Sequence, residues 1–255
     1  MFFFANPNLP DRPVSLAVVD SRISDASSRC LERYGVKQLR LPAHRALYDA
    51  VSSHPDIMLH HIGGDLIIHA PGMDAGFLAA LRYCGFSLIQ GEKALTATYP
   101  GDIAYNVARV GKYYFHNLRY TDPVIVNHLD RLGIEPVHTE QGYAKCSILP
   151  VDEKSIVTTD AGIAKAAEKK GLDVLMLECG SSIRLNGLNY GFIGGACAMI
   201  SDTACAVNGS LKKLVDSERF ISFLSKKQIN IIELSNYDVT DIGSIIPLMV
   251  TSRSN

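Results

Sequence analysis

A helix end, a glycine and a short apolar strand recur five times along this chain, and this repeat restricts the possible folds more than any single motif does. The five corners are RYG at 33–35, RYCG at 82–85, DRLG at 130–133, EKKG at 168–171 and, with glutamine in place of glycine, SKKQ at 225–228. Their irregular spacing of about 48 residues lies within the range of known repeat architectures. Glycine suits the left-handed residue that ends a helix, so each corner predicts a helix stop before a strand. Five such units on one chain predict a closed ring rather than five independent domains.

The segments between the corners follow one order. In the second, third and fourth units two strands come in tandem, at 56–63 and 65–71, at 102–111 and 112–117, and at 142–152 and 154–160. A helix entered through Asp or Thr-Asp then follows in each of these units. The first unit lacks one strand, and the last segment, DIGSIIPLMV at 241–250, has no helix after it. Pairing of this last strand with the first unit would close the ring; an open α/β sheet, which is the alternative, would not need that pairing.

The composition is that of an ordinary globular protein. Of the 255 residues, 47% are hydrophobic and 20% are charged, and the formal net charge is -1, without a long run of Lys or Arg. This pattern lacks the electrostatic signature of proteins that bind nucleic acids or anionic membranes. The start, MFFFANPNLP, has no basic region, and no window reaches transmembrane length, so a cytoplasmic protein is expected.

The cysteines do not form a metal-binding or disulfide pattern. They are scattered along the chain without a CxxC pair, at Cys30, Cys84, Cys146, Cys179, Cys197 and Cys205. This spacing argues against a zinc site and against a dense disulfide framework. No metal and no other cofactor is therefore expected, and most of the thiols are expected to be buried as small apolar groups.

With this order of units the sequence resembles the pentein fold, the five-bladed α/β propeller of the guanidine-group-modifying enzymes, which include arginine deiminases, amidinotransferases and dimethylarginine hydrolases. The resemblance covers roughly residues 14 to 250 and depends on the order of the units more than on identity. The stretches at 52–65, 105–122, 141–163, 189–198 and 241–250 are also similar to an uncharacterised bacterial family of this fold. The resemblance implies one pentein domain over residues 1–255, with pseudo-fivefold symmetry, closed by its C-terminal strand, and a ligand site at the centre.

Enzymes of this fold combine a cysteine, a histidine and carboxylates. A thiolate attacks the amidine carbon, an imidazole protonates the leaving amine, and paired carboxylates match the planar cation. By resemblance, the carboxylate positions fall on Asp56 and Asp102, each at the mouth of an inner strand. Both are expected to lie near the ring axis and to bind the substrate. The alternative is that each Asp only caps a turn before a strand.

Other positions depart from the pattern of these enzymes. Tyr99 occupies the place of the acid/base carboxylate, and the histidine position falls on or beside Tyr143. Pro247 or Ile246 stands where the nucleophilic cysteine is expected. Losing one member of a covalent catalytic set removes several orders of magnitude in rate, so the usual deiminase or hydrolase mechanism is not assumed. If the protein is an enzyme, the resemblance implies a divergent hydrolase or transferase that acts on C–N amidine bonds.

Nearby polar residues are candidates for a rearranged site. Cys146 is the candidate for a relocated nucleophile, since the adjacent Lys145 could stabilise its thiolate, and His54 is the candidate catalytic imidazole. Tyr143, Lys145 and Asn106 are candidate substrate-binding groups, and Asn106 is expected on the strand face that carries the third unit's carboxylate. The alternatives are a buried structural cysteine and an exposed loop histidine.

Two further features bear on this site. Lys145 and Cys146 are neighbours in a predicted strand, so they are expected to face opposite ways. The charge of Lys145 also disfavours a cationic substrate unless the two carboxylates neutralise it. The run from Gly194 to Cys197 superficially resembles a motif of the enzymes, but it lies on the first strand of the fifth unit. We interpret it as close packing of backbone near the axis.

These residues leave two main hypotheses and a third possibility. In the first, a small polar ligand, such as an amino acid or a guanidino or amidine compound, binds at the central pore, where catalysis is left open. In the second, the ring is a non-enzymatic binding module of the type represented by the ribosome anti-association translation initiation factor of this fold. The third is a degenerate enzyme retained for regulation as a homo-oligomer. Neither nucleic acid nor a membrane is an expected partner.

Overall fold

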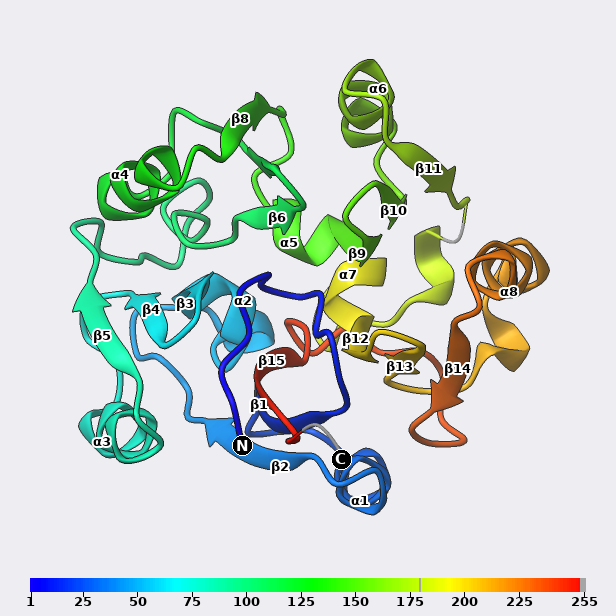
Figure 1. The fold of residues 1–255 in the computed structure, drawn as a ribbon, viewed down its shortest axis with the longest axis horizontal. Coiled ribbons are helices and arrows are strands. Elements are labelled where there is room, and N and C mark those ends of the chain that lie inside the picture. Colours follow the sequence, from blue (N-terminus) through cyan, green and yellow to red (C-terminus); the bar gives the residue numbers. More distant parts are fainter. Residues whose placement is uncertain (179, 253–255) are drawn as a thin grey trace.

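Five small sheets surround a common centre in this computed structural model, which describes residues 1–178 and 180–252 (Figure 1). Each sheet in the described part of the chain has three strands. The helices α1, α3, α4, α6 and α8 lie on the outside of the sheets (Figure 1). The predicted α/β class, built from repeated units, is therefore confirmed.

All five sheets share one plan. The first holds β15 (Ile246–Val250), β1 (Val14–Asp20) and β2 (Lys37–Leu41); the second, β3 (Leu59–Gly63), β4 (Leu66–His69) and β5 (Ser87–Gln90); the third, β6 (Ala108–Val110), β7 (Tyr113–His116) and β8 (Glu135–His138); the fourth, β9 (Ile148–Asp152), β10 (Ser155–Thr158) and β11 (Asp173–Met176); the fifth, β12 (Cys197–Ser201), β13 (Ala204–Val207) and β14 (Asn230–Glu233). The middle strand of each sheet pairs antiparallel with the inner strand and parallel with the outer one.

A helix links the two parallel strands of each sheet. These helices are α1 (Asp25–Arg33), α3 (Ala75–Tyr83), α4 (Pro123–Arg131), α6 (Ala161–Lys169) and α8 (Ser217–Lys226). In the first four, a backbone N–H of the first turn donates to a capping side chain, that of Ser24, Asp74, Asp122 or Asp160. The predicted Asp entries of α3, α4 and α6 are therefore confirmed. The second residue after each helix has positive φ, at Gly35, Gly85, Gly133, Gly171 and Gln228. The predicted corners are thus confirmed, including the one in which glutamine replaces glycine.

Several predicted inner strands begin later than the sequence indicated. Their first residues form single helical turns instead, which are α2 (Pro55–Met58), α5 (Ala144–Ser147) and α7 (Ile193–Ala196). In the third unit, residues 102–107 also lie outside the strand. Near the centre these residues bond to neighbouring units rather than to a β-ladder, as when the N–H of Lys145 donates to the Asn106 carbonyl at 3.1 Å. Short 3-10 segments lie at η1 (Asp49–Val51), η2 (Gly180–Ser182) and η3 (Leu211–Lys213).

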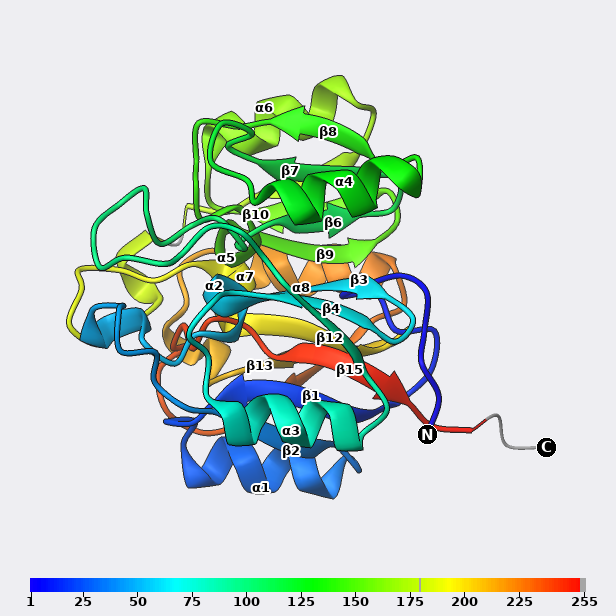
Figure 2. The same ribbon diagram turned by 90° about the vertical axis from the view of Figure 1, so that its left-hand side faces the viewer.

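Both ends of the chain contribute to the first sheet. β15 runs antiparallel to β1, with Pro247 opposite Ala17, and Phe2 forms an isolated bridge to Val250. β15 is therefore a strand of the first sheet, and Figure 2 shows the described ends of the chain on one side of the molecule. One buried apolar cluster joins the first three sheets through side chains such as those of Leu16, Ile68 and Tyr114.

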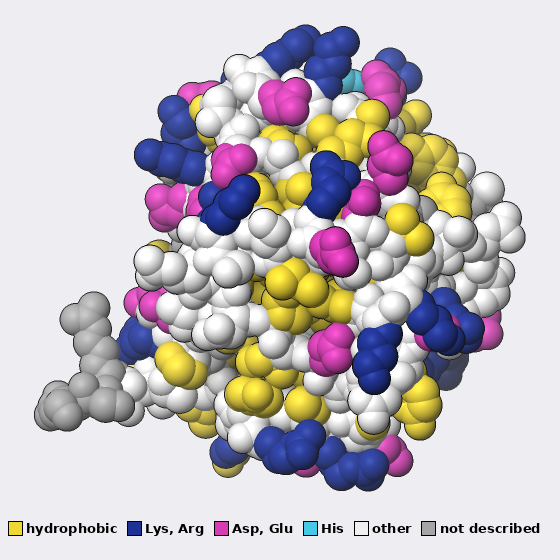
Figure 3. All heavy atoms as spheres, turned by 90° about the vertical axis from the view of Figure 1, so that its right-hand side faces the viewer, with side chains coloured by type: hydrophobic (Ala, Val, Ile, Leu, Met, Phe, Trp, Pro, Cys, Tyr) yellow, Lys and Arg dark blue, Asp and Glu magenta, His cyan; other side chains and the backbone are white. Residues whose placement is uncertain are grey.

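Two features of the described residues concern membranes and surface charge, namely the lengths of the helices and the distribution of charged side chains on the face in Figure 3. No helix in residues 1–178 or 180–252 is long and apolar enough to cross a membrane. In Figure 3, Lys and Arg side chains are interspersed with Asp and Glu rather than gathered together.

Candidate functional site

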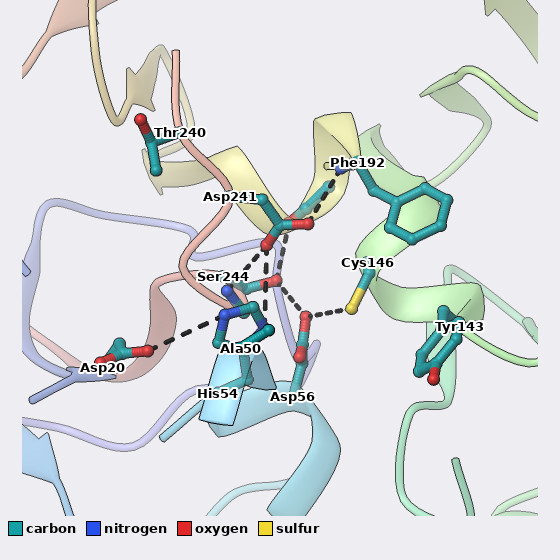
Figure 4. A network of polar contacts seen from close by, with 12 residues as sticks. Asp20, Ala50, His54, Asp56, Tyr143, Cys146, Phe192, Thr240, Asp241 and Ser244 are labelled. Atoms are coloured by element: carbon teal, nitrogen blue, oxygen red, sulfur yellow. Dashed lines mark hydrogen bonds and ion pairs between the residues drawn. The ribbon is translucent and has the colours of Figure 1, made fainter. Parts of the chain in front are cut away.

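The short helices α2, α5 and α7 and the segment before β15 meet near the middle of the molecule (Figures 1 and 4). The helices α5 and α7 pack closely, since a Cβ atom at Gly194 would lie 2.5 Å from the carbonyl oxygen of Lys145. Only glycine allows such an approach, so the predicted close packing of backbone at this position is confirmed. The contact brings polar side chains of several units together.

Asp56, on α2, lies at the centre of a buried network. Its Oδ2 accepts hydrogen bonds from Ser244 Oγ at 2.8 Å and from Cys146 Sγ at 3.1 Å (Figure 4). Lys145 Nζ donates to Ser244 Oγ at 2.8 Å and to the carbonyl of Gly194 at 3.3 Å. The prediction that Lys145 and Cys146 face opposite ways is therefore wrong. Successive residues on a helical turn differ by about 100°, so both side chains can reach one network.

Asn106 uses its whole side chain to hold α5 in place. Its Nδ2 donates to the Asp56 carbonyl and to Cys146 Sγ, both at 3.1 Å. Its Oδ1 accepts the backbone N–H of Lys145 at 2.8 Å and of Cys146 at 3.2 Å. Since an amide has two donor hydrogens and two acceptor lone pairs, no group is left for a ligand. The predicted strand face shared with Asp102 is also wrong, because both residues lie in the segment before β6.

Burial controls the charge state of the thiol. It raises the pKa of Cys146 well above the usual value, and the neighbouring carboxylate of Asp56 adds to the rise. Burial also lowers the pKa of Lys145, against the opposing attraction of Asp56. The Cys146 thiol therefore keeps its proton and donates it to Asp56. The rise in the Cys146 pKa favours the neutral thiol over the predicted thiolate stabilised by Lys145.

Tyr143 and Asp102 form a second polar pair. The Tyr143 hydroxyl donates to Asp102 Oδ2 at 2.5 Å. The Tyr48 hydroxyl lies 3.5 Å from the Tyr143 hydroxyl. Burial raises the pKa of Asp102, and burial together with the bond to Asp102 raises the pKa of Tyr143. The carboxylate of Asp102 is fully buried. The bond to Asp102 makes the Tyr143 oxygen a better hydrogen-bond acceptor, because a hydroxyl that donates to a carboxylate is polarised by it.

His54 is a buried residue, with only 2% of its surface accessible, so the alternative of an exposed loop histidine is wrong. Its Nε2 lies 3.8 Å from Asp20 Oδ2, and its Nδ1 lies 3.9 Å from Asp241 Oδ1. Both distances exceed hydrogen-bond length but leave strong electrostatic coupling. Asp241 is fixed by the backbone N–H groups of Phe192 and Gly243, each at 2.9 Å. Figure 4 shows the imidazole between the two carboxylates.

A cavity of about 230 Å³ lies beside these groups and is termed here the aromatic cavity. Its walls include four aromatic side chains, those of Tyr48, Tyr143, Tyr190 and Phe192. The ring centroids of Tyr143 and Phe192 lie 6.1 Å apart, and those of Tyr190 and Phe192 lie 5.7 Å apart. None of the described residues that line the cavity is Lys or Arg.

The seven predicted site residues divide into two sets. His54, Tyr143 and Cys146 line the aromatic cavity together with Asp241. The other four lie behind it, bonded to Cys146, Tyr143 or Ser244, and are Asp56, Asp102, Asn106 and Lys145. The structure therefore brings all seven into one region, although only three face the space that a ligand could fill.

Sequence reasoning missed Asp20, Tyr48, Asp241 and Ser244. Pro247, one of the two positions where the resemblance places the nucleophile, lies in β15 opposite Ala17 of β1. From the same segment it is Ser244, at φ 72°, that reaches the buried network. Asp241 and Ser244 belong to DIGS, at the start of a stretch already noted for its resemblance, so a weak signal existed for these two. Nothing in the local sequence singles out Asp20 or Tyr48.

Among the described cysteines, Cys30, Cys146, Cys197 and Cys205 are buried, as expected. The remaining predicted thiol, Cys179, lies outside the described residues. No group of three or more His, Cys, Asp or Glu side chains within residues 1–178 and 180–252 could hold a metal ion.

A model of one protein family matches residues 18–246 and is described as a family of unknown function (DUF6873). The chain belongs to this family. No curated protein sequence matches the chain. Since the family description carries no reaction, only the site itself bears on the chemistry.

Solved structures of similar fold cover nearly the whole chain. The amidinotransferase SxtG from Microseira wollei, of the saxitoxin biosynthetic pathway, is 14% identical over 98% of this chain and 98% of its own, with a TM-score of 0.60. The inosamine-phosphate amidinotransferase StrB1 from Streptomyces griseus is 12% identical over 100% and 98%, with a TM-score of 0.62. DDAH from Pseudomonas aeruginosa, complexed with citrulline, is 9% identical over 88% and 93%, with a TM-score of 0.55. The chain has the pentein fold, as its unit order predicted.

Proposed function

We propose that the protein binds a small cation with a planar amidinium or guanidinium group in the aromatic cavity. The lining of the cavity carries this proposal, because four aromatic side chains surround it with Asp241 and no described Lys or Arg does. A planar cation is attracted to aromatic faces and forms strong hydrogen bonds to a carboxylate. The amidinotransferases of similar fold favour the same class of ligand.

Two acceptors are placed for the cation. Asp241 lines the aromatic cavity, and burial raises its pKa, so a bound cation would favour its ionised form. The Tyr143 oxygen is the second acceptor, since its proton is directed to Asp102. The sequence analysis regarded the positive charge of Lys145 as unfavourable for a cationic ligand. Lys145 does not line the aromatic cavity, because its Nζ donates to Ser244 Oγ and lies near Asp56.

The proposal includes a closed five-bladed propeller around this site. Antiparallel pairing of β15 with β1 joins the last segment of the chain to its first unit, and this pairing supports closure. Asp56, Cys146 and Ser244 come from different units and are joined by hydrogen bonds. A closed ring would hold these three units in a fixed arrangement and so maintain the hydrogen bonds.

A second candidate function is a divergent amidino-group hydrolase or transferase. The position of Cys146 favours it, because Sγ lines the cavity and already donates to Asp56. In the proposed step the thiol proton passes to Asp56 and sulfur bonds to the amidine carbon. The C–N bond to the leaving amine then breaks as Asp56 passes the same proton to that amine. A cation beside the sulfur stabilises the thiolate that this step requires.

Calorimetric titration with benzamidine tests the binding proposal, with benzamide as a neutral control of the same shape. We expect benzamidine to bind and benzamide not to bind detectably. Replacing Asp241 by Asn should weaken benzamidine binding by about tenfold or more, since a hydrogen bond to a charged group contributes roughly 1.5–3 kcal/mol. Equal affinity for the two compounds, or no binding of either, would refute the proposal.

Incubation with S-methylisothiourea, an amidine with a good leaving group, tests the catalytic version. Mass spectrometry should find the amidino group on Cys146 in the wild-type protein and no adduct in the Cys146→Ser variant. Replacing Asp56 by Asn should slow the labelling, because the thiol then loses its proton acceptor. An unlabelled Cys146 in a protein that binds benzamidine would leave binding intact and exclude the enzymatic version.

A further inference from the structure

A second cavity, of about 280 Å³, lies on the other side of His54 and is termed here the charged cavity. It shares three lining residues with the aromatic cavity, namely His54, Leu185 and Asp241. Most of its other described lining residues are polar or charged, and they include Asp20 and Arg22. Among the described residues, His54 and Asp241 are thus the ionisable groups common to both cavities.

Asp20, on the charged side of His54, is held in one position. Arg22 donates from Nε to Asp20 Oδ1 at 3.0 Å and from Nη2 to Asp20 Oδ2 at 2.7 Å. The same guanidinium donates to the carbonyls of Asp49 at 2.6 Å and Ala50 at 3.1 Å. Such a bidentate pair fixes the direction of the carboxylate toward His54 Nε2.

Two glycines, Gly243 and Gly195, leave space for the side chains of His54 and Asp241. A Cβ atom at Gly243 would lie 2.5 Å from His54 Cα, and one at Gly195 would lie 2.6 Å from Asp241 Oδ2. Real Cβ atoms do not approach so closely, and Gly243 also has a φ of 64°. Only glycine at positions 243 and 195 leaves enough space for the side chains of His54 and Asp241.

His54 has an incomplete set of hydrogen bonds in this position. Its Nδ1 is buried and has no hydrogen-bond partner. Buried polar atoms in proteins are normally paired, and exceptions need an explanation such as a catalytic role. Here the unpaired atom faces Asp241 at 3.9 Å, while Nε2 on the opposite side of the ring faces Asp20 at 3.8 Å.

We propose that His54 couples cation binding in the aromatic cavity to release of a proton into the charged cavity, with Asp241 and Asp20 as the positioning residues on its two sides. The proposal rests on cation binding in the aromatic cavity. When a cation enters beside Asp241, it repels a protonated imidazole next to the same carboxylate. The imidazolium then releases its Nε2 proton toward Asp20 and the charged cavity, and the imidazole regains the proton when the cation leaves.

Other charged or ionisable groups also act on His54. They are Arg22 beside Asp20, Asp56 on α2, Tyr143 and Cys146 across the aromatic cavity, and Arg184 and Asp238 across the charged cavity. Of these, Arg22, Arg184 and Asp238 belong to ion pairs of their own. Asp20 and Asp241 are the carboxylates that face the two ring nitrogens of His54.

Calorimetry of benzamidine binding in two buffers of different ionisation enthalpy tests this coupling. The difference in apparent enthalpy gives the number of protons released per ligand, measured between about pH 5.5 and pH 7, where histidines titrate. We expect the wild-type protein to release a large fraction of one proton and the His54→Asn variant to release none. The Asp20→Asn variant should release fewer protons but keep its affinity above pH 7, since Asp20 does not line the aromatic cavity.

Asp238→Asn is the matched control, because Asp238 lines the charged cavity but pairs with Arg184 and Lys213 rather than with His54. It should release as many protons as the wild type. Nitrogen NMR of the wild-type histidines provides a reading that needs no variant: benzamidine should move the His54 ring signals toward the neutral form. Benzamidine binding without proton release, or release that persists in His54→Asn, overturns the coupling alone. Absence of benzamidine binding overturns the coupling together with the proposed function.

Discussion

Three buried histidines should make this fold sensitive to acid. His60, His61 and His116 expose 4%, 3% and 0% of their surface. Burial lowers the pKa of His60 from 6.5 to about 3, and that of His61 and of His116 to about 4. Each imidazole is therefore neutral in the folded protein across the range in which it would gain a proton in the unfolded chain.

The sign and size of the effect follow from these values. As the pH falls below about 6.5, the unfolded chain binds three protons that the folded protein does not, so the free energy of unfolding decreases until the folded pKa values are reached. Since one pKa unit corresponds to about 1.4 kcal/mol, each histidine removes about 2 kcal/mol by about pH 5, and the three remove about 6 kcal/mol. Typical domains have about 5–15 kcal/mol in all. Asp102 and Asp241 reduce this loss, because burial raises their pKa values and the folded protein then binds protons more readily.

Urea unfolding followed by circular dichroism at about pH 7.5 and about pH 5 measures this loss. Urea is preferable to guanidinium chloride, because guanidinium resembles the proposed ligand. The His116→Asn variant should lose about one third less stability between the two pH values than the wild type. His138→Asn is the control, since His138 has 49% of its side chain exposed and its replacement removes no buried imidazole. An unfolding midpoint that is the same at both pH values would refute the reasoning.

Three substitutions test other parts of the structure. Gln228 has φ 59°, so Gln228→Gly should relieve about 1 kcal/mol of left-handed strain and raise the melting temperature; a decrease would show that its side chain matters more. Gly195→Ala would place a Cβ 2.6 Å from Asp241 Oδ2 and should abolish benzamidine binding and cost about 1–3 kcal/mol in urea; unchanged affinity would mean that Asp241 is not the cation partner. Lys145→Met removes the donor to Ser244 Oγ and to the Gly194 carbonyl and should cost about 1–3 kcal/mol of stability; unchanged stability would contradict the network.

The strand starts near the centre show where sequence reasoning fails. GYAKCSILPVD was interpreted as one strand, but its first residues form a turn of helix, α5, before β9. A short apolar run is compatible with a strand or with a buried helical turn, so periodicity could not separate them. The choice depends on partners from other units, such as Asn106, whose amide takes the backbone N–H groups of Lys145 and Cys146.

By itself, the sequence determined the five repeated units, their helix starts and their corners, because capping side chains and left-handed residues act over a few neighbouring positions. It also indicated the segments that supply the site, including Asp56, Tyr143 and Cys146. Only the tertiary structure decided which side chains face the aromatic cavity, that His54 lies between Asp20 and Asp241, and that the Cys146 thiol keeps its proton. These properties depend on burial and on distances between residues far apart in the chain, which no local pattern encodes.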